Sequence, residues 1–242
     1  MGLVLVFDMD QTIIDSSNGI KEYKTSAEMV KEIRAAFNEK LVNQVLRPAA
    51  KLRDEGKVDA ILLLTNSSLK LFASTVSLIL GDQLGSFSKY DTPLVNPALK
   101  TYYIGANSQR PLESFFDYIM WRGHPARPNS EDPPKSMADV KYMVEQLALP
   151  LEDLEERTYF FDDRDDHKIG DEFRALGLDD HYIHIDANLP ELASGYSKGA
   201  PNSTDYSTMT MVFNKLMKSK GGSRKNKKNK VRKSKYKKTR KH

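Results

Sequence analysis

Two carboxylates and a hydroxyl follow an apolar run near the start of the chain. Residues 3–7 are apolar, and Asp8, Asp10 and Thr12 come directly after them. Side chains two apart in an extended chain share a face, so we expect Asp8 and Asp10 to project together. Two like charges about 4 Å apart repel by roughly 4 kcal/mol at an effective dielectric near 20, so such a pair usually needs a cation or a shared proton. The pattern favours phosphoryl-transfer chemistry, with a turn-forming Asp cluster as the structural alternative.

A second acidic cluster follows the apolar run at 158–161. Four carboxylates lie within five residues there: Asp162, Asp163, Asp165 and Asp166. Such a group is hard to keep ionised without a bound cation or a nearby base. Oxygen ligands suit Mg²⁺, which accepts one or two carboxylates together with phosphate oxygens. Arg164 lies inside the run, so a purely structural Asp–Arg network is the alternative.

Two further segments could bind phosphate oxygens. Thr65 and Asn66 follow the apolar run 60–64 and open an expected helix, whose free N–H groups and dipole would attract an anion. Ordinary helix capping is the alternative for Thr65. Lys135 is expected in the first turn of a helix capped by Asp132, where the dipole disfavours a cation. A bound anion would remove that conflict, and a solvated surface lysine is the alternative.

The elements that must position these residues alternate between strands and helices. The sequence predicts strands at 3–7, 60–64, 158–161 and 182–185, and helices at 25–41, 44–55, 69–80, 132–147, 169–176 and 208–217. Gly56 and Gly177 stand where two of these helices should end. The alternation predicts an α/β fold, a Rossmann-like parallel sheet with helices on both faces.

The remaining segments give the domain organisation. We expect a catalytic domain over 1–193, a linker and short helix over 194–217, and a disordered basic tail over 218–242. Prolines interrupt residues 81–132, which we interpret as an insertion over the mouth of the sheet, helical at 112–121. This insertion contains candidate substrate contacts, with an ordinary loop as the alternative: Trp121, Arg122, His124 and Arg127.

Charge is distributed unevenly along the 242 residues. The net charge of +4 is the sum of two parts. The tail has 14 Lys or Arg residues and no acidic residue, and the rest of the chain has a net charge of about −10. The tail favours non-specific attraction to nucleic acid or another polyanion, or docking on the acidic body, and it fits the loose pattern of a nuclear localisation signal. The chain has no Cys and no apolar stretch near the roughly 18 residues of a membrane span. We therefore expect an intracellular protein without membrane partners, nuclear through its tail or otherwise cytoplasmic.

The order of the four polar motifs resembles that of the haloacid dehalogenase (HAD) superfamily of phosphatases. Its members have Asp-x-Asp-x-Thr after the first strand, Ser or Thr after the second, then a Lys, then an acidic pair after a further strand. Asp8 to Thr12, Thr65, Lys135 and Asp162-Asp163 match in type, order and context over roughly residues 1–190. Gln11 departs from the Gly or Glu common in the family. The Asp162-Asp163-Arg164 run is similar to the branch of polynucleotide-end and protein C-terminal-domain phosphatases.

The resemblance implies a role for each of these positions. Asp8 would be the nucleophile that forms an aspartyl-phosphate, and Asp10 the general acid and base. Thr65, Asn66 and Lys135 would hold the phosphoryl oxygens of the phosphorylated substrate.

The same resemblance implies Mg²⁺ as the cofactor. Its ligands would be Asp8, the Asp10 carbonyl and Asp163, with Asp162 as a competing candidate. The leading hypothesis is a Mg²⁺-dependent phosphohydrolase acting on nucleic-acid ends or a phosphoprotein. The alternative is a non-catalytic HAD-like scaffold that binds nucleic acid through residues 218–242.

Overall fold

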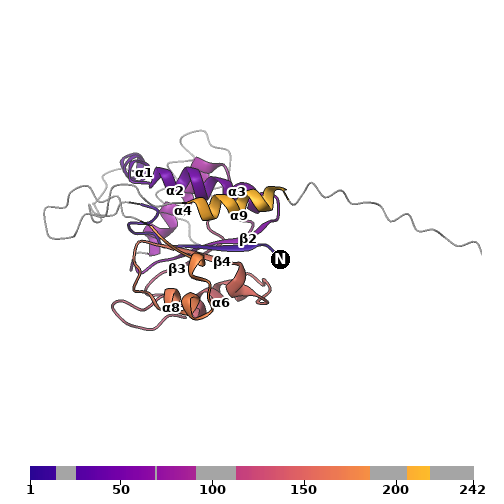
Figure 1. Cartoon of the computed structure of the whole chain (residues 1–242). Helices are drawn as coiled ribbons and strands as arrows, with labels where there is room; N and C mark the ends of the chain where they lie inside the picture. The colour runs from indigo at the N-terminus through magenta and orange to yellow at the C-terminus, as the bar shows by residue number, and fades with distance from the viewer. Residues whose placement is uncertain (15–25, 69, 91–112, 186–205, 219–242) are drawn as a thin grey trace, which may run out of the picture.

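The computed structural model describes residues 1–14, 26–68, 70–90, 113–185 and 206–218. Its centre is a five-stranded, entirely parallel sheet in the order β3-β2-β1-β4-β5 (Figure 1). The strands are β1 Leu3–Phe7, β2 Val58–Leu64, β3 Tyr118–Met120, β4 Thr158–Asp162 and β5 Tyr182–His184. Because β1 lies between β2 and β4, the residues that follow these three strands meet at one edge of the sheet.

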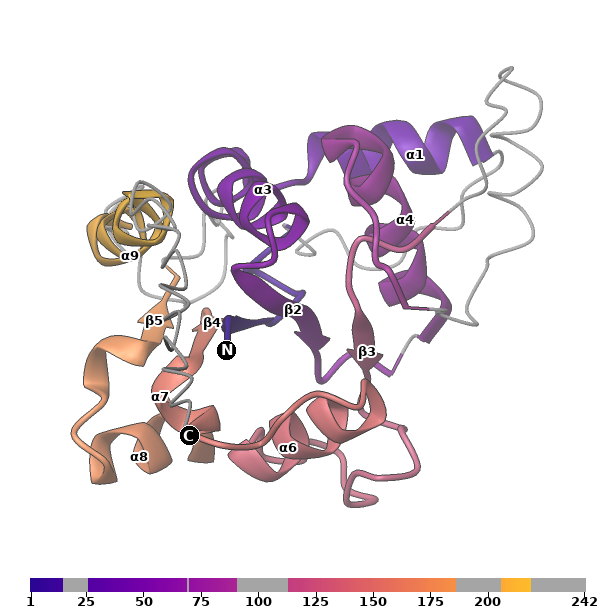
Figure 2. The ribbon, with the colours of Figure 1, turned by 90° about the vertical axis from the view of Figure 1, so that its right-hand side faces the viewer.

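Helices cover both faces of the sheet, as the strand composition requires. Strands β1, β2 and β4 are near-continuous apolar runs, which is typical of a parallel sheet buried on both sides. Figure 2 shows α1, α3, α4 and α9 on one face and α6, α7 and α8 on the other. Their bounds are α1 Ser26–Ala35, α3 Arg47–Asp54, α4 Lys70–Leu84, α6 Met137–Gln146, α7 Leu154–Arg157, α8 Lys168–Ala175 and α9 Ser207–Lys218.

The core has two layers, and alternate residues of β1 belong to each. Leu5 and Phe7 pack into the layer under α1, α3, α4 and α9, where the Phe7 ring stacks on that of Phe161 with centroids 4.4 Å apart. Val4 and Val6 pack into the opposite layer with buried side chains of α6 and α8. Because β1 is buried on both sides, its position is fixed, and so is the position of Asp8 at its end.

The predicted α/β class, the parallel sheet and all four predicted strands are confirmed, with boundaries that differ by two residues or fewer. The strand β3 was missed, and the predicted helix at 112–121 is wrong. Asp117 accepts a hydrogen bond from the Ile61 N–H at 2.8 Å, and residues 118–120 then pair with β2. Three residues at a sheet edge are too short to show a period in the sequence.

Between residues 26 and 54 the helices of the structure differ from the two that the sequence predicts. The predicted helix 25–41 is divided into α1 and α2 Glu39–Leu41, because Ile14 bridges to Phe37 and Asn38 caps α2 by accepting from the Leu41 N–H. The π-helix η1 Val42–Leu46 then continues into α3. Gly56 and Gly177 follow α3 and α8 with φ of 69° and 71°, the left-handed conformation expected of a glycine after a helix.

The predicted helix at 132–147 begins later than expected. Its first residue is Met137, so Lys135 lies in the extended segment before α6 and not in a first turn. The predicted helix at 69–80 continues to Leu84, so residues 81–84 of the expected insertion belong to α4, and residues 118–120 belong to β3. A short 3₁₀ turn, η2 Asp179–His181, leads into β5.

Several predictions concern segments outside the described residues. These are the start of the capping box at Thr25, the middle of the insertion at 91–112, the linker at 194–205 and the basic tail from 219 onward. Among the helices of the described residues, none combines the length and apolar character needed to cross a bilayer.

Candidate metal and phosphate site

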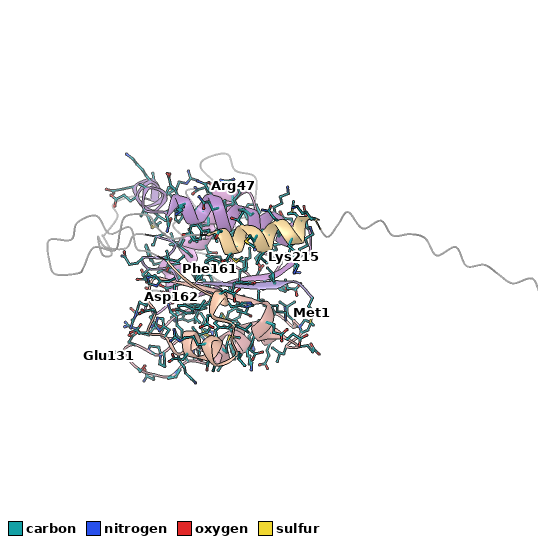
Figure 3. All side chains as sticks on the ribbon, in the orientation of Figure 1. Met1, Arg47, Glu131, Phe161, Asp162 and Lys215 are labelled. Atoms are coloured by element: carbon teal, nitrogen blue, oxygen red, sulfur yellow. The ribbon has the colours of Figure 1, made fainter. Side chains whose placement is uncertain are left out.

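Four distant segments converge at the carboxyl ends of the strands. Asp8 follows β1, Thr65 follows β2, Lys135 precedes α6, and Asp162 ends β4. Figure 3 places Asp162 at the side of the sheet away from Met1, as expected for the carboxyl end of a strand that runs parallel to β1. Because the strands are parallel, the motifs that follow them in the sequence lie close together in space.

Lys135 lies between two buried carboxylates. Its Nζ is 2.7 Å from Asp8 Oδ1 and 2.6 Å from Asp162 Oδ2. Only 1% of Lys135 is exposed, compared with 5% of Asp8 and none of Asp162. The surface-lysine alternative is therefore wrong. Burial disfavours the ammonium form, but Asp8 and Asp162 outweigh it and raise the pKa of Lys135, which keeps the side chain charged.

One ammonium does not balance the carboxylates around it. Asp163 lies beside Asp8 and Asp162, and one oxygen from each of the three comes within 4.8 Å of the others. Burial raises the pKa of Asp8 to about 6, and Asp162 adds to the rise while Lys135 opposes it. Burial, followed by Asp8 and Asp162, raises the pKa of Asp163 to about 7. We call these four residues the carboxylate cluster: Asp8, Lys135, Asp162 and Asp163.

The carboxylate cluster could hold a metal ion. Three oxygen donors from two strand ends, with more negative charge than Lys135 neutralises, form a donor set of the kind that divalent cations bind. The raised pKa values of Asp8 and Asp163 show that the protein alone does not stabilise all of these charges. A divalent cation would supply the missing positive charge, so the residues present fit such an ion.

Asp10 faces the neighbouring strand end. Its Oδ2 accepts a 3.4 Å hydrogen bond from Thr65 Oγ1, which in turn accepts from the Ser67 N–H at 3.0 Å. The carboxylates of Asp8 and Asp10 therefore contact different partners, because β1 ends at Phe7 and strand periodicity no longer applies at Asp10. The turn between them and Thr12 includes Gln11 at φ 62°, a conformation that glycine adopts more easily.

Asn66 lies at the rim and does not contact the carboxylate cluster through the hydrogen bonds seen here. Its amide donates to Asp132, which also accepts from Arg164 at 2.9 Å. Arg164 forms a second, two-bonded pair with Asp166. The Asp–Arg network expected as an alternative thus exists, but its side chains involve Asp132 and Asp166. The contact of Arg164 with Asp162 is through its backbone N–H, at 3.0 Å.

The residues expected to contact substrate from the insertion make contacts within the protein. Arg127 is 6% exposed and donates to the backbone carbonyls of Thr65 and Pro133. His124 packs with Tyr118 and Trp121, and its Nε2 lies 3.2 Å from the Tyr118 hydroxyl. Arg122 donates to the Glu131 carbonyl, and Lys70 lies over the Trp121 ring. Arg127 is therefore a buried residue that hydrogen-bonds to the backbone.

Two residues near the carboxylate cluster were missed by sequence reasoning. His167 occupies the N-cap position of α8 without a side-chain capping hydrogen bond, is 3% exposed, and has Nε2 3.7 Å from Asp162 Oδ2. Burial, with Lys135 and Arg164, lowers the pKa of His167 to about 4, so the ring is neutral near pH 7. Tyr182 of β5 donates its hydroxyl hydrogen to the Arg164 carbonyl. His167 directly follows the acidic run, and that adjacency was the available signal.

The chain matches no model of a known protein family, no curated protein and no solved structure. The fold and site define a Rossmann-like parallel α/β protein with a buried acidic group near its first strand that could hold a metal ion. This arrangement is consistent with a HAD-like phosphatase and does not identify one.

Proposed function

We propose that the protein is a Mg²⁺-dependent phosphohydrolase of the HAD type that works through an aspartyl-phosphate. One observation carries the proposal. Lys135 Nζ lies within 2.7 Å of carboxylate oxygens of both Asp8 and Asp162, and Asp163 is close enough to share a cation with these two. Three of the four motifs that resemble the HAD family supply this cluster. The fourth, Thr65, contacts the second aspartate of the first motif.

The proposed reaction uses Asp8 and Asp10 in turn. An Asp8 oxygen attacks phosphorus, the bond from phosphorus to the ester oxygen breaks, and Asp10 gives its proton to the leaving alcohol. Water then attacks the aspartyl-phosphate, Asp10 takes a proton from it, and the bond between phosphorus and Asp8 breaks. The products are the alcohol and inorganic phosphate.

The neighbouring residues hold the charge that these steps move. Lys135 and the Thr65 hydroxyl would donate to the phosphoryl oxygens, and Asp8, Asp163, Asp162 and the Asp10 carbonyl are the candidate ligands of Mg²⁺. When bound, Mg²⁺ would offset the negative charge of the phosphoryl group and of the surrounding carboxylates. Burial strengthens these interactions because little water screens them.

Hydrolysis of an aryl phosphate tests the proposal. With Mg²⁺ present, we expect Asp8→Asn to lower the rate by about 1000-fold or more, because the amide cannot form the covalent intermediate. Asp82→Asn is the matched control, since Asp82 lies on the exposed surface of α4 and pairs with Arg34. Equal rates for Asp8→Asn and the wild type, or no hydrolysis of any phosphoester tried, would reject the proposal.

The basic segment 218–242 supports a second, independent proposal about partners. Its 14 Lys and Arg residues without an acidic residue favour binding to a nucleic-acid backbone or another polyanion. We expect deletion of residues 219–242 to remove binding to single-stranded RNA and DNA while aryl-phosphate hydrolysis continues. Nucleic-acid binding that requires the tail, in a protein without phosphatase activity, would favour the non-catalytic scaffold.

A further inference from the structure

Arg127 connects the two segments that carry the proposed phosphate-binding residues. Its two terminal nitrogens donate to the carbonyl of Thr65 and to the carbonyl of Pro133, each at 3.0 Å. Thr65 follows β2, whereas Pro133 lies two residues before Lys135. A single planar guanidinium therefore spans the gap between the Thr65 and Lys135 segments.

The Arg127 side chain is buried and lies near a carboxylate. None of its side chain is exposed, and Nε lies 3.6 Å from Asp139 Oδ1. The other oxygen of Asp139 accepts from the N–H and hydroxyl of Ser136 at the start of α6. Burial lowers the pKa of Arg127, while Asp139, Asp8 and Asp132 favour the charged form. The cation thus lies in the field of the same cluster that contains Lys135.

The backbone hydrogen bonds of the two segments go to different neighbours. The Thr65 N–H donates to the Met120 carbonyl, which attaches Thr65 to the edge of β3. The Lys135 carbonyl accepts from the Ile169 N–H at the start of α8. Each segment is thus anchored to its own neighbour. Arg127 links the two segments through their backbone carbonyls, and Asn66 and Asp132 link them a second time through their side chains.

We propose that Arg127 is a positioning residue that fixes the spacing between the Thr65 hydroxyl and the Lys135 ammonium, and thereby shapes the site for a tetrahedral phosphoryl group. This inference rests on the proposed function. Among the described residues, the hydrogen bonds of Arg127 go to the two backbone carbonyls and none goes to the carboxylate cluster, so its proposed role is indirect. Lysine at this position keeps the charge but cannot donate in the same fork to two carbonyls.

The test compares Arg127→Lys and Arg127→Met with Arg53→Lys. Arg53 is also buried and donates to a backbone carbonyl, that of Phe115, but it lies outside the carboxylate cluster. Rates are divided by the folded fraction from circular dichroism. We expect kcat for aryl-phosphate hydrolysis to fall about 10-fold in Arg127→Lys and about 100-fold in Arg127→Met, because small displacements of binding groups weaken transition-state contacts.

Two equilibrium measurements separate positioning from general damage. By calorimetry on the Mg²⁺-loaded protein, we expect affinity for inorganic phosphate to fall about 10-fold in Arg127→Lys, while Mg²⁺ affinity stays within about twofold of wild type. Mg²⁺ affinity should change little in Arg127→Lys because lysine keeps the positive charge that acts on Asp8. Arg53→Lys should lose stability and keep the wild-type kcat and phosphate affinity.

The outcomes distinguish this inference from the proposed function. Wild-type protein that neither hydrolyses phosphoesters nor binds phosphate overturns both. Wild-type protein that does both, with Arg127 variants of equal kcat and phosphate affinity, overturns only the role of Arg127. An equal catalytic loss in Arg53→Lys also overturns it, because the effect would then be general destabilisation.

Discussion

Two of the buried ionic groups in the described part of the chain differ in charge balance. In the carboxylate cluster, three carboxylates face the single ammonium of Lys135. In the second group, which we call the Arg53 pair, Arg53 of α3 lies 3.3 Å from Asp117, the residue before β3. Arg53 also donates to the Phe115 carbonyl and Ser86 hydroxyl, and Asp117 accepts from the Ile61 N–H.

The difference shows which group is complete without a ligand. The Arg53 pair has one charge of each sign and backbone partners for both, so it serves to fasten the segment before β3 against α3 and β2. Burial raises the pKa of Asp117 as well as that of Asp163, so the groups differ in their charge count: the carboxylate cluster has three carboxylates for one ammonium. Breaking the Arg53 pair should lower stability whether or not metal is present, whereas the stability of variants in the carboxylate cluster should depend on metal.

The largest effect on stability is expected from the Arg53 pair. Arg53→Met leaves Asp117 buried without its cation, and we expect unfolding free energy to fall by about 3–5 kcal/mol in urea denaturation. The activity of the folded fraction at low temperature should match wild type, because this pair is outside the proposed site. The double variant Arg53→Met with Asp117→Leu should recover part of the loss. A loss below about 1 kcal/mol would contradict the assigned structural role.

Lys135→Met sharpens the comparison because it also removes a buried cation. We expect a loss of about 3 kcal/mol without added metal, since Asp8 and Asp162 lose their shared partner. Added Mg²⁺ should restore part of this stability in Lys135→Met and none in Arg53→Met. The measurement is thermal unfolding of each variant with EDTA and with Mg²⁺. Equal responses to Mg²⁺ in the two variants would remove the distinction between the groups.

The smallest of the three effects is the stabilisation of the wild type by Mg²⁺. A ligand at 100 times its dissociation constant stabilises the folded state by about 2.7 kcal/mol, which should appear as a rise in Tm. Asp163→Asn should abolish the rise because it removes one of the three oxygen donors, whereas Asp82→Asn should retain it. A rise that persists in Asp163→Asn would place the ion elsewhere.

Much of the fold was predictable because its signals are local. The run Leu3–Phe7 is apolar throughout and bounded by Asp8, so its strand was predicted with the correct ends. Gly56 and Gly177 marked helix ends for the same reason, since positive φ is a property of a single residue. The strand β3 was not predictable in this way. It forms because β2 offers an unpaired edge and Asp117 holds the chain beside Ile61.

The candidate site divides in the same manner. The sequence by itself determined which residue types follow which strands: carboxylates after residues 7 and 161, and a hydroxyl after residue 64. Only the tertiary structure decided that Lys135 lies between Asp8 and Asp162, that Asp10 instead contacts Thr65, and that Arg127 is buried against two backbone carbonyls. The physical reason is that these two kinds of interaction act over different distances along the sequence. Strand and turn propensities act over a few residues, whereas the partners of buried charges such as Lys135 are decided by packing between segments that are far apart in the sequence.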